Sequence, residues 1–233
     1  MKFAIITAIW QREPITKIFL KSVQRYWQDY GIQTMIAGSE GVRTRDMCLD
    51  AGAGYTETPN EPLSKKWNQA IMGAWIAWKP DGFILMGSDD FMNDKIIETL
   101  QNALIKGIDV AGFRDCYFYN SKTGEAGYWA GYSVDHRRGE SIGMGRLLSA
   151  KAFKALGGRP WSHARAGLDW IMMQRLKKQK FLKREVFSVK DVGGALLDVK
   201  GFGNLSGYTA YQLEPFDMTI LDTIPEFSEI KSL

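Results

Sequence analysis

Short apolar runs and helical stripes of apolar residues alternate along the first half of the chain. Residues 3–9 form a β-branched run, suited to a strand buried on both faces. Apolar side chains then recur at three- and four-residue spacing over residues 15–30, between a proline and Gly31, which predicts a helix with both ends marked. Residues 32–37 predict a second strand and residues 53–57 a weaker third one.

The same alternation continues to about residue 110. Ser64 is a candidate cap for a helix whose apolar stripe runs from Trp67 to Trp78. Residues 83–86 form the most apolar strand candidate of the chain, and Asn93 is placed to cap the helix that follows. Alternating strands and helices predict an α/β fold with a mostly parallel sheet flanked by helices.

The pattern becomes less regular beyond this point. Residues 109–145 contain several short β-like pieces that are rich in aromatic residues and glycine, and helices are expected at about 149–156 and 167–180. The last fifty residues read as irregular. Because no repeat or linker interrupts the chain, we treat residues 1–233 as one domain with a regular first half (about 1–110) and a less regular second half (about 111–233).

Composition narrows the class of protein. The chain has 233 residues, of which 45% are hydrophobic and 24% charged, which excludes a disordered chain, a collagen-like repeat and a disulfide scaffold. Only two cysteines are present, Cys48 and Cys116, so a reducing compartment is the simpler assumption. No apolar run approaches the roughly 20 residues that span a bilayer, and the N-terminus lacks the shape of a signal peptide. We therefore expect a cytoplasmic protein.

The net charge of +4 is small, but basic residues gather between Gln174 and Lys190. Seven of the side chains in that segment are Lys or Arg, and only Glu185 opposes them. One interpretation is a solvated helix face and loop. The other is a surface for phosphate-bearing ligands or nucleic acid, and the count of charges does not choose between them.

Acidic residues at two places in the sequence are candidates for metal binding or catalysis. Asp89 and Asp90 follow the very apolar strand, at the edge where open parallel sheets bind ligands. Paired carboxylates there suit Mg²⁺ or Mn²⁺ bound to nucleotide phosphates, although a strand-to-helix turn is also typical of such residues. Asp169 lies in the expected first turn of a helix, where it either complements the helix dipole or acts as a general base.

The sequence gives little support for a zinc site, a dinucleotide-binding motif or an aromatic stacking platform. The two histidines, His136 and His163, have no cysteine or histidine at metal-ligand spacing, which argues against a zinc site. Gly143-Met-Gly-Arg146 is rich in glycine but does not fit a dinucleotide fingerprint. The aromatic residues of 113–132 are more typical of a core than of a stacking platform.

Four segments, taken in order, resemble a glycosyltransferase of the GT-A fold, close to the large inverting family 2. The first strand with Trp10-Gln-Arg12-Glu-Pro14 is similar to that family's opening strand and Asn-Arg-Pro-type turn, and Lys65-Lys66-Trp67-Asn68-Gln-Ala70 is similar to its Ala-Arg-Asn segment. The run from Phe83 to Asp89-Asp90-Phe91 resembles the strand that ends in Asp-x-Asp. The run from Gly143 to Gly167-Leu-Asp169-Trp170 resembles the approach to the Glu-Asp motif. The resemblance covers residues 1 to about 180.

The resemblance implies a nucleotide-sugar donor, a UDP-sugar first of all, a Mn²⁺ or Mg²⁺ ion, and an inverting transfer to an acceptor hydroxyl. It implies that residues 1–110 bind the nucleotide sugar and that residues 111–233 form the acceptor side. The residues assigned to the donor are Thr7, Ile9, Arg12, Glu40, Lys66, Asn68, Ser88 and Asp89. Asp89 and Asp90 are assigned to the metal, Asp169 to the general base, and His163, Arg165 and Trp170 to the acceptor side.

The sequence leaves the identity of the acceptor open, and it leaves two other functional classes of protein as alternatives. The acceptor is either a glycan or DNA carrying a hydroxymethylated pyrimidine, as in phage-type DNA modification, because the basic segment follows Asp169 directly. Gly87 replaces the first acid of Asp-x-Asp and Leu168 replaces the acid before Asp169, which keeps a non-catalytic nucleotide-sugar-binding module as an alternative. A sugar nucleotidyltransferase is the third class, but residues 10–13 lack its Gly-x-Gly-Thr-Arg-type loop.

Overall fold

The computed structural model describes residues 1–164, 167–201 and 207–233. Its strands form a seven-stranded sheet in the order β10-β6-β9-β4-β1-β2-β3 and a four-stranded sheet in the order β5-β11-β7-β8. In the large sheet only β9 runs antiparallel to its neighbours, so the predicted α/β fold with a mostly parallel sheet is confirmed.

The elements have the following bounds. The large sheet contains β1 (Phe3–Ala8), β2 (Gln33–Gly38), β3 (Gly54–Glu57), β4 (Gly82–Leu85), β6 (Val110–Phe113), β9 (Arg146–Ser149) and β10 (Arg184–Phe187). The small sheet contains β5 (Asp90–Met92), β7 (Cys116–Asn120), β8 (Ala126–Trp129) and β11 (Leu196–Lys200). The helices are α1 (Glu13–Tyr30), α2 (Val42–Asp50), α3 (Leu63–Trp78), α4 (Asp94–Ile105), α5 (Ala150–Ala155), α6 (Leu168–Lys178), α7 (Val189–Val192) and α8 (Phe227–Ile230). Short 3₁₀ turns lie at Asp135–Arg137, Tyr208–Ala210 and Met218–Thr223.

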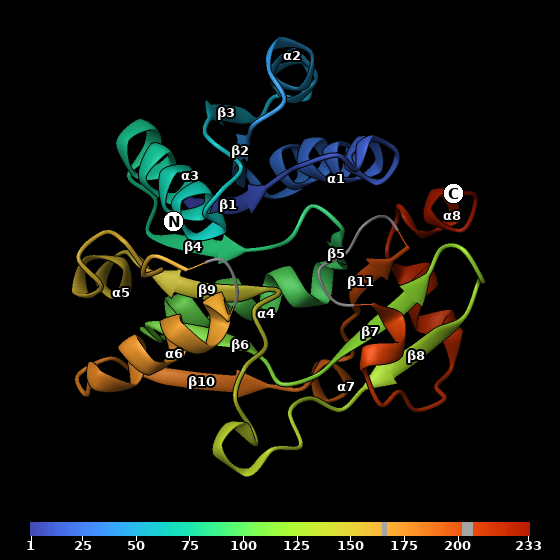
Figure 1. Ribbon diagram of the computed structural model, residues 1–233. Helices are drawn as coiled ribbons and strands as arrows, with labels where there is room; N and C mark the ends of the chain where they lie inside the picture. The colour runs from blue at the N-terminus through green and yellow to red at the C-terminus, as the bar shows by residue number, and fades with distance from the viewer. Residues whose placement is uncertain (165–166, 202–206) are drawn as a thin grey trace.

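Alternating side chains of the central strands divide the core into two layers. Ile5 of β1 packs with α1, α4 and the small sheet, whereas Ala4 and Ile6 pack with α3, α5 and α6 on the opposite face. Figure 1 shows the two groups of helices on either side of the large sheet, with α2 beyond its β3 edge. Both faces of β1 and β4 are thereby buried, which explains their continuous apolar sequences.

The sequence interpretation differs from the structure in several elements. Helix α2 and strand β5 were not predicted, and two further differences concern the start of α3 and the last fifty residues. Ser64 was expected to cap α3, but Pro62 precedes the helix and Ser64 lies in its first turn, where its hydroxyl accepts the Ala164 N–H at 3.0 Å. The last fifty residues were expected to be irregular, yet they include β10 and β11, which pair with β6 and with both β5 and β7. Both strands are short, and only pairing with distant strands stabilises them.

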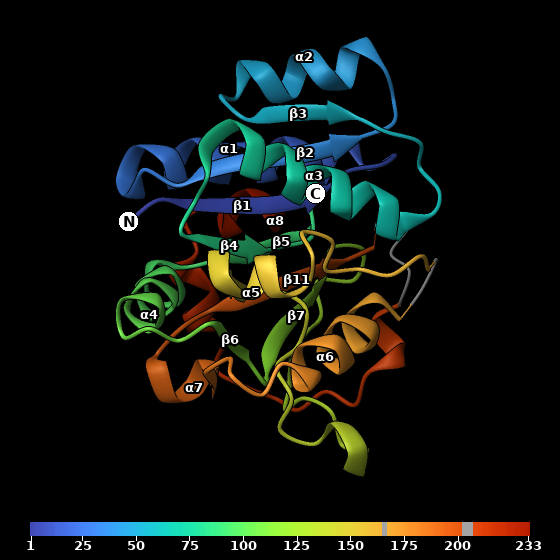
Figure 2. The same cartoon turned by 90° about the vertical axis from the view of Figure 1, so that its left-hand side faces the viewer.

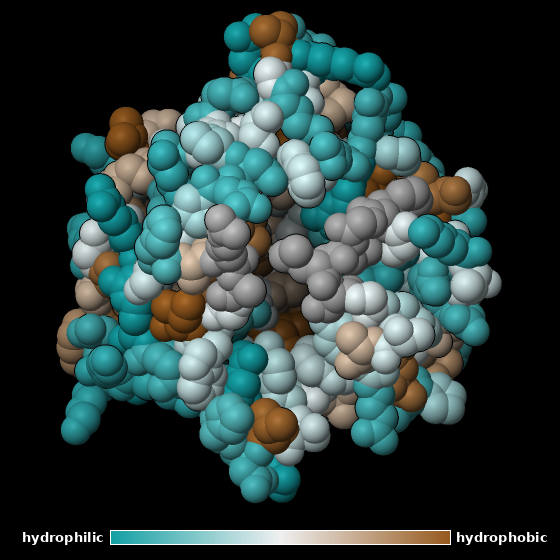
Figure 3. Space-filling model, viewed as in Figure 1, coloured by the Kyte–Doolittle hydropathy of each residue, from teal (hydrophilic) through white to brown (hydrophobic). Residues whose placement is uncertain are grey.

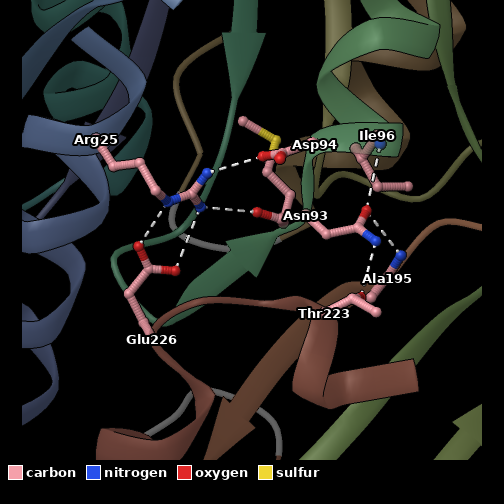
Figure 4. Close-up of polar contacts among 8 residues, drawn as sticks. Arg25, Asn93, Asp94, Ile96, Ala195, Thr223 and Glu226 are labelled. Carbon is pink, nitrogen blue, oxygen red and sulfur yellow. Dashed lines mark hydrogen bonds and ion pairs between the residues drawn. The ribbon is translucent and has the colours of Figure 1, made fainter. Parts of the chain in front are cut away.

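A polar brace fixes the C-terminal segment against β5 (Figure 4). Arg25 of α1 donates to Glu226 at 2.9 Å and to the carbonyl of Met92 at 3.1 Å. The Asn93 side chain donates to Thr223 at 2.9 Å, and its side-chain oxygen accepts the N–H of Ala195, the residue before β11, and the N–H of Ile96 in α4. These contacts hold the end of β5 to both the C-terminal segment and β11, so they help to position the acidic residues at the other end of these strands.

Candidate active site

A cleft of about 590 Å³ opens where β4 ends and the large sheet meets the small one. Its walls come from the 85–90 segment, from β7, β8 and β11, and from the first turn of α6. The space-filling view shows that this face of the molecule is hollowed near its centre (Figure 3). Asp89, Asp90 and Asp169 all line this cleft, so residues far apart in the sequence meet in one cavity.

Three carboxylates gather at one end of the cleft. Asp90 begins β5 and lies directly across the strand pair from Asp198 of β11, with Asp89 beside them. Gly87 donates its N–H to Asp90, and a Cβ at Gly87 would lie 2.8 Å from an Asp89 oxygen and 2.9 Å from an Asp90 oxygen. Position 87 therefore has no room for the additional acid of an Asp-x-Asp motif in this arrangement.

Burial controls the protonation of this acidic cluster. It raises the pKa of Asp90 well above its ordinary value, and the neighbouring charges of Asp198 and Asp89 raise it further. Burial also raises the pKa of Asp198 to about 6, against the opposing effect of Lys200, whose ammonium lies 2.7 Å from the Asp198 carboxylate. Burial thus favours the protonated form of the Asp90 and Asp198 carboxyls over the ionised form.

Arg12 supplies a second cation to the cluster from the loop after β1. Its guanidinium contacts Asp89 at 2.5 Å and the Ser88 hydroxyl at 3.3 Å. Gln11, the preceding residue, has a left-handed backbone (φ 52°), and its N–H donates to the Glu40 carboxylate at 2.9 Å. This contact ties the end of β2 to the strained loop that presents Arg12.

Lys66 is buried and joins three segments next to the cleft. Its ammonium donates to the Ile9 carbonyl at 2.6 Å, to Ser39 at 2.9 Å and to Asn60 at 3.0 Å. Burial lowers the pKa of Lys66 to about 8. Since an ammonium has three N–H donors, these contacts use all of them, and Lys66 shapes the adjoining cavity of about 300 Å³.

The chemistry of the acidic cluster fits a divalent cation. Carboxylate oxygens are the hard ligands that Mg²⁺ and Mn²⁺ prefer. Asp198 Oδ1 is buried and lacks a hydrogen-bond partner among the described residues, so this oxygen is available as a ligand. Within residues 1–164, 167–201 and 207–233, no three His, Cys, Asp or Glu side chains converge as a complete set. A cation here would need further oxygens from a bound ligand or from water.

Asp169 also lines the cleft and is held by a buried arginine. Its carboxylate is about 39% exposed, and it contacts the guanidinium of Arg146, which is fully buried, at 3.3 Å. Arg146 also donates to the carbonyl of Ser141 at 2.7 Å and to its hydroxyl at 3.2 Å. A Cβ at Gly143 would lie 2.5 Å from the Asp169 carboxyl carbon, so the glycine makes the close approach of this carboxylate possible.

Aromatic residues form the remaining wall. The rings of Trp67 and Trp161 lie 5.3 Å apart, and the Trp170 ring meets His136 edge-on at 5.1 Å. Trp129 and Tyr132 also line the cleft. Most of the aromatic residues of 113–132 are buried in the core, as the sequence interpretation favoured, and these two are the exceptions.

Of the sequence-predicted site residues that the structure describes, half meet at one cleft, and the others lie in other cavities or within a strand. Those on the cleft or in direct contact with its acidic end are Arg12, Ser88, Asp89, Asp90, Asp169 and Trp170. Ile9, Glu40 and Lys66 lie in adjoining cavities. Thr7 is buried within β1, and Asn68 and His163 line a separate groove. Arg165 lies outside the described residues.

Three residues of the site were missed in the sequence, namely Asp198, Lys200 and Arg146. Asp198 was passed over because the last fifty residues were read as irregular, although a single acid within the apolar run Ala195–Val199 was a usable signal. Arg146 was seen only as part of a glycine-rich segment, and nothing local indicates that its charge is buried.

The basic segment 175–190 proves to be partly structural. Arg175 donates to the backbone carbonyls of Leu156 and Pro160 at 2.8 Å, and Lys177 pairs with Glu140 at 2.5 Å. Arg184 donates to a carbonyl at 3.1 Å, and the ammonium of Lys190 lies 3.5 Å from a tyrosine ring centroid. These side chains stabilise the fold around α6, so fewer charges are available to a partner than the sequence indicates.

Comparison with solved structures identifies the fold. S. aureus TarS 1–349 matches with a TM-score of 0.61 at 12% identity, over 85% of this chain and 60% of that chain. A longer TarS structure gives the same TM-score, with 37% of that chain covered. The chain therefore spans less than two thirds of TarS.

A second solved protein matches the whole chain. Glucosyl-3-phosphoglycerate synthase from Mycobacterium tuberculosis, in complex with phosphoglyceric acid, matches with a TM-score of 0.51 at 11% identity, over 100% of this chain and 80% of that one. No protein-family model and no curated protein sequence matches the chain. The structural likenesses show that the chain has the GT-A fold of nucleotide-diphospho-sugar transferases, as the sequence resemblance implied.

Proposed function

We propose that this protein is a glycosyltransferase that moves a sugar from a UDP-sugar to an acceptor hydroxyl with inversion. The proposal rests on the residues that line one cleft of a GT-A fold. Asp89, Asp90 and Asp198 line this cleft, with Arg12 paired to Asp89 and Lys200 to Asp198. Asp169 lines the same cleft and has a separate partner, Arg146. This arrangement offers separate places for a charged leaving group and for an acceptor.

The acidic end suits a nucleoside diphosphate. A departing diphosphate gains negative charge, which Arg12 and Lys200 are placed to stabilise. Asp89, with Asp90 and Asp198 beside it, would hold Mn²⁺ or Mg²⁺, and the bound ion would neutralise phosphate charge. A solved complex of the mycobacterial synthase with Mn²⁺, UDP and glucosyl-3-phosphoglycerate, which matches at a TM-score of 0.50 and 10% identity, supports this assignment.

Asp169 suits the role of general base. Its partly exposed carboxylate can accept the proton of an acceptor hydroxyl as that oxygen attacks the sugar. The contact with Arg146 restricts the carboxylate to one orientation, which lowers the cost of reaching the reactive geometry. A single base and direct attack from the face opposite the leaving group give inversion.

A glycan is the favoured acceptor. Hydroxymethylated-pyrimidine DNA was the alternative because of the basic segment 175–190, and several of those side chains are engaged within the protein. None of the helices in the described part of the chain is both long and apolar enough to cross a bilayer. The phosphoglyceric acid named in the mycobacterial complex is a small hydroxyl-bearing molecule, which is also consistent with a non-nucleic-acid acceptor.

Thermal denaturation with nucleoside diphosphates and nucleotide sugars tests the donor assignment. UDP at 100 times its dissociation constant adds about 2.7 kcal/mol to the free energy of unfolding, and we expect a larger shift when Mn²⁺ is present. A panel in which no nucleotide shifts the melting temperature contradicts the proposal.

Asp169→Asn tests the base separately from donor binding. The variant keeps the size of the side chain, so we expect it to retain the UDP shift and to lose release of UDP from the donor. Undiminished UDP release by the variant refutes the assignment of Asp169.

The same measurements on the unmodified protein distinguish the two alternative functions. Binding without any turnover indicates the non-catalytic nucleotide-sugar-binding module. Release of pyrophosphate when a sugar phosphate meets UTP indicates a sugar nucleotidyltransferase.

A further inference from the structure

A second groove, of about 830 Å³, runs beside the cleft between α3 and the segment that joins α5 to α6. Asn68 of α3 exchanges hydrogen bonds with the backbone of Trp161, donating at 2.7 Å and accepting at 3.3 Å. Ser64 makes a similar pair of contacts with Ala164, at 3.0 and 3.3 Å. Figure 2 shows the described part of this segment, residues 156–164, passing next to the first turns of α3. The groove therefore has walls that are fixed to each other.

The groove is positively charged. Lys65, Arg159 and Arg175 line it together with His163, and no Asp or Glu is among its described lining residues. Lys65 and Arg159 are exposed and have no carboxylate partner in the described part of the chain. The Arg175 N–H groups are used by backbone carbonyls, but no carboxylate of the described residues neutralises their charge. An anionic ligand would be attracted along the whole groove.

A second feature points to a ligand that carries hydroxyl groups. The side-chain oxygen of Gln69, which also lines the groove, is buried and has no hydrogen-bond donor among the described residues. Buried acceptors without a donor are uncommon in folded proteins because they lose their hydration without compensation. A hydroxyl group of a bound molecule would satisfy this oxygen.

The groove adjoins the proposed active site through one residue. Trp161 lines both the groove and the cleft, and its ring packs on Trp67 at the cleft wall. A chain seated in the groove can therefore extend past Trp161 toward Asp169.

The shape of the groove disfavours nucleic acid. The volume of about 830 Å³ lies within the roughly 300–1,000 Å³ that is typical of a site for a small molecule or a short oligomer. Single-stranded nucleic acids need exposed aromatic rings for stacking, and the aromatic residue of this groove, Trp161, is only 4% exposed.

We propose that this groove binds an anionic oligosaccharide, the part of the acceptor that precedes the hydroxyl placed near Asp169. The inference rests on the proposed glycosyl transfer for the role of the oligosaccharide as acceptor. The binding itself follows from the charge of the groove and from the unpaired Gln69 oxygen.

Binding of fluorescently labelled hexagalacturonate, measured by anisotropy at low salt, tests the proposal. The groove variant is Lys65→Ser with Arg159→Ser, and the matched control is Lys178→Ser with Lys180→Ser, which removes the same charge from positions outside the groove. We expect the groove variant to bind about tenfold more weakly than the unmodified protein. The slope of its log affinity against log salt concentration should fall by about one for each cation removed from the groove. The control should bind within about twofold of the unmodified protein.

Three results would overturn the proposal: equal binding by the two double variants, binding of neutral maltohexaose as tight as that of hexagalacturonate, or tighter binding of the oligonucleotide dT6. The UDP shift is measured on the same proteins. If UDP shifts none of them while the groove variant alone fails to bind hexagalacturonate, the donor assignment fails and the groove stands. If UDP shifts all of them and the two double variants bind alike, the groove alone fails.

Discussion

Gly143→Ala offers a sharp test of how Asp169 is positioned. The added Cβ would lie 2.5 Å from the Asp169 carboxyl carbon, whereas an ordinary contact begins at 3.4 Å. The carboxylate therefore has to move by roughly 1 Å, which breaks its contact with Arg146 at 3.3 Å. Misplacement of a catalytic group by 1 Å can cost about 100-fold in rate, so we expect kcat to fall by about that factor.

The assay is release of UDP from the donor identified by thermal denaturation, with kcat and KM measured separately. KM for the donor should change little, because Asp169 pairs with Arg146, whereas the residues assigned to the diphosphate pair with Arg12 and Lys200. The matched control is Gly207→Ala, where an added Cβ meets no atom of the described residues within 4 Å. The reasoning is refuted if Gly143→Ala keeps more than about a third of the rate, or if its loss is matched by Gly207→Ala.

Three further predictions concern other parts of the site. Arg25→Met leaves the buried Glu226 carboxylate without its cation, and we expect the free energy of unfolding in urea to fall by about 2–4 kcal/mol. Lys66 has a pKa lowered by burial to about 8, against 10.5 for an ordinary lysine, so the unfolded chain binds its proton more tightly. Between about pH 8 and 10 the unfolding free energy of the unmodified protein should therefore rise relative to that of Lys66→Met. Asp198→Asn should weaken Mn²⁺ binding, measured by titration with UDP present, by about tenfold or more.

Each of these has a contrary outcome, and two of them have a matched control variant. Lys21→Met breaks the exposed pair with Glu229 and should cost less than about 0.5 kcal/mol, and an equal cost for Arg25→Met contradicts the role of the brace. A pH-independent difference between the unmodified protein and Lys66→Met contradicts the lowered pKa. Asp222→Asn is an exposed control for Asp198→Asn, and equal Mn²⁺ affinities would remove Asp198 from the site.

Local patterns in the sequence were sufficient for much of the fold. Continuous apolar runs predicted β1 and β4, because a strand that is buried on both faces is apolar at every position. Helical spacing with its end signals predicted α1 and α4, because a helix that is buried on one face has an apolar residue every three or four positions. Asn93 caps α4 as expected, with its side chain accepting the Ile96 N–H. Short strands that depend on distant partners were missed, as β10 and β11 illustrate.

The sequence by itself determined which acids stand at strand and helix ends, namely Asp89, Asp90 and Asp169, because their position follows from local elements. Only the tertiary structure decided their partners. Strand pairing sets Asp198 opposite Asp90, and the pairing of β9 with β4 and β6 buries Arg146 where it reaches Asp169. Register between strands far apart in the chain fixes these contacts, and local hydrophobic patterns carry no information about it.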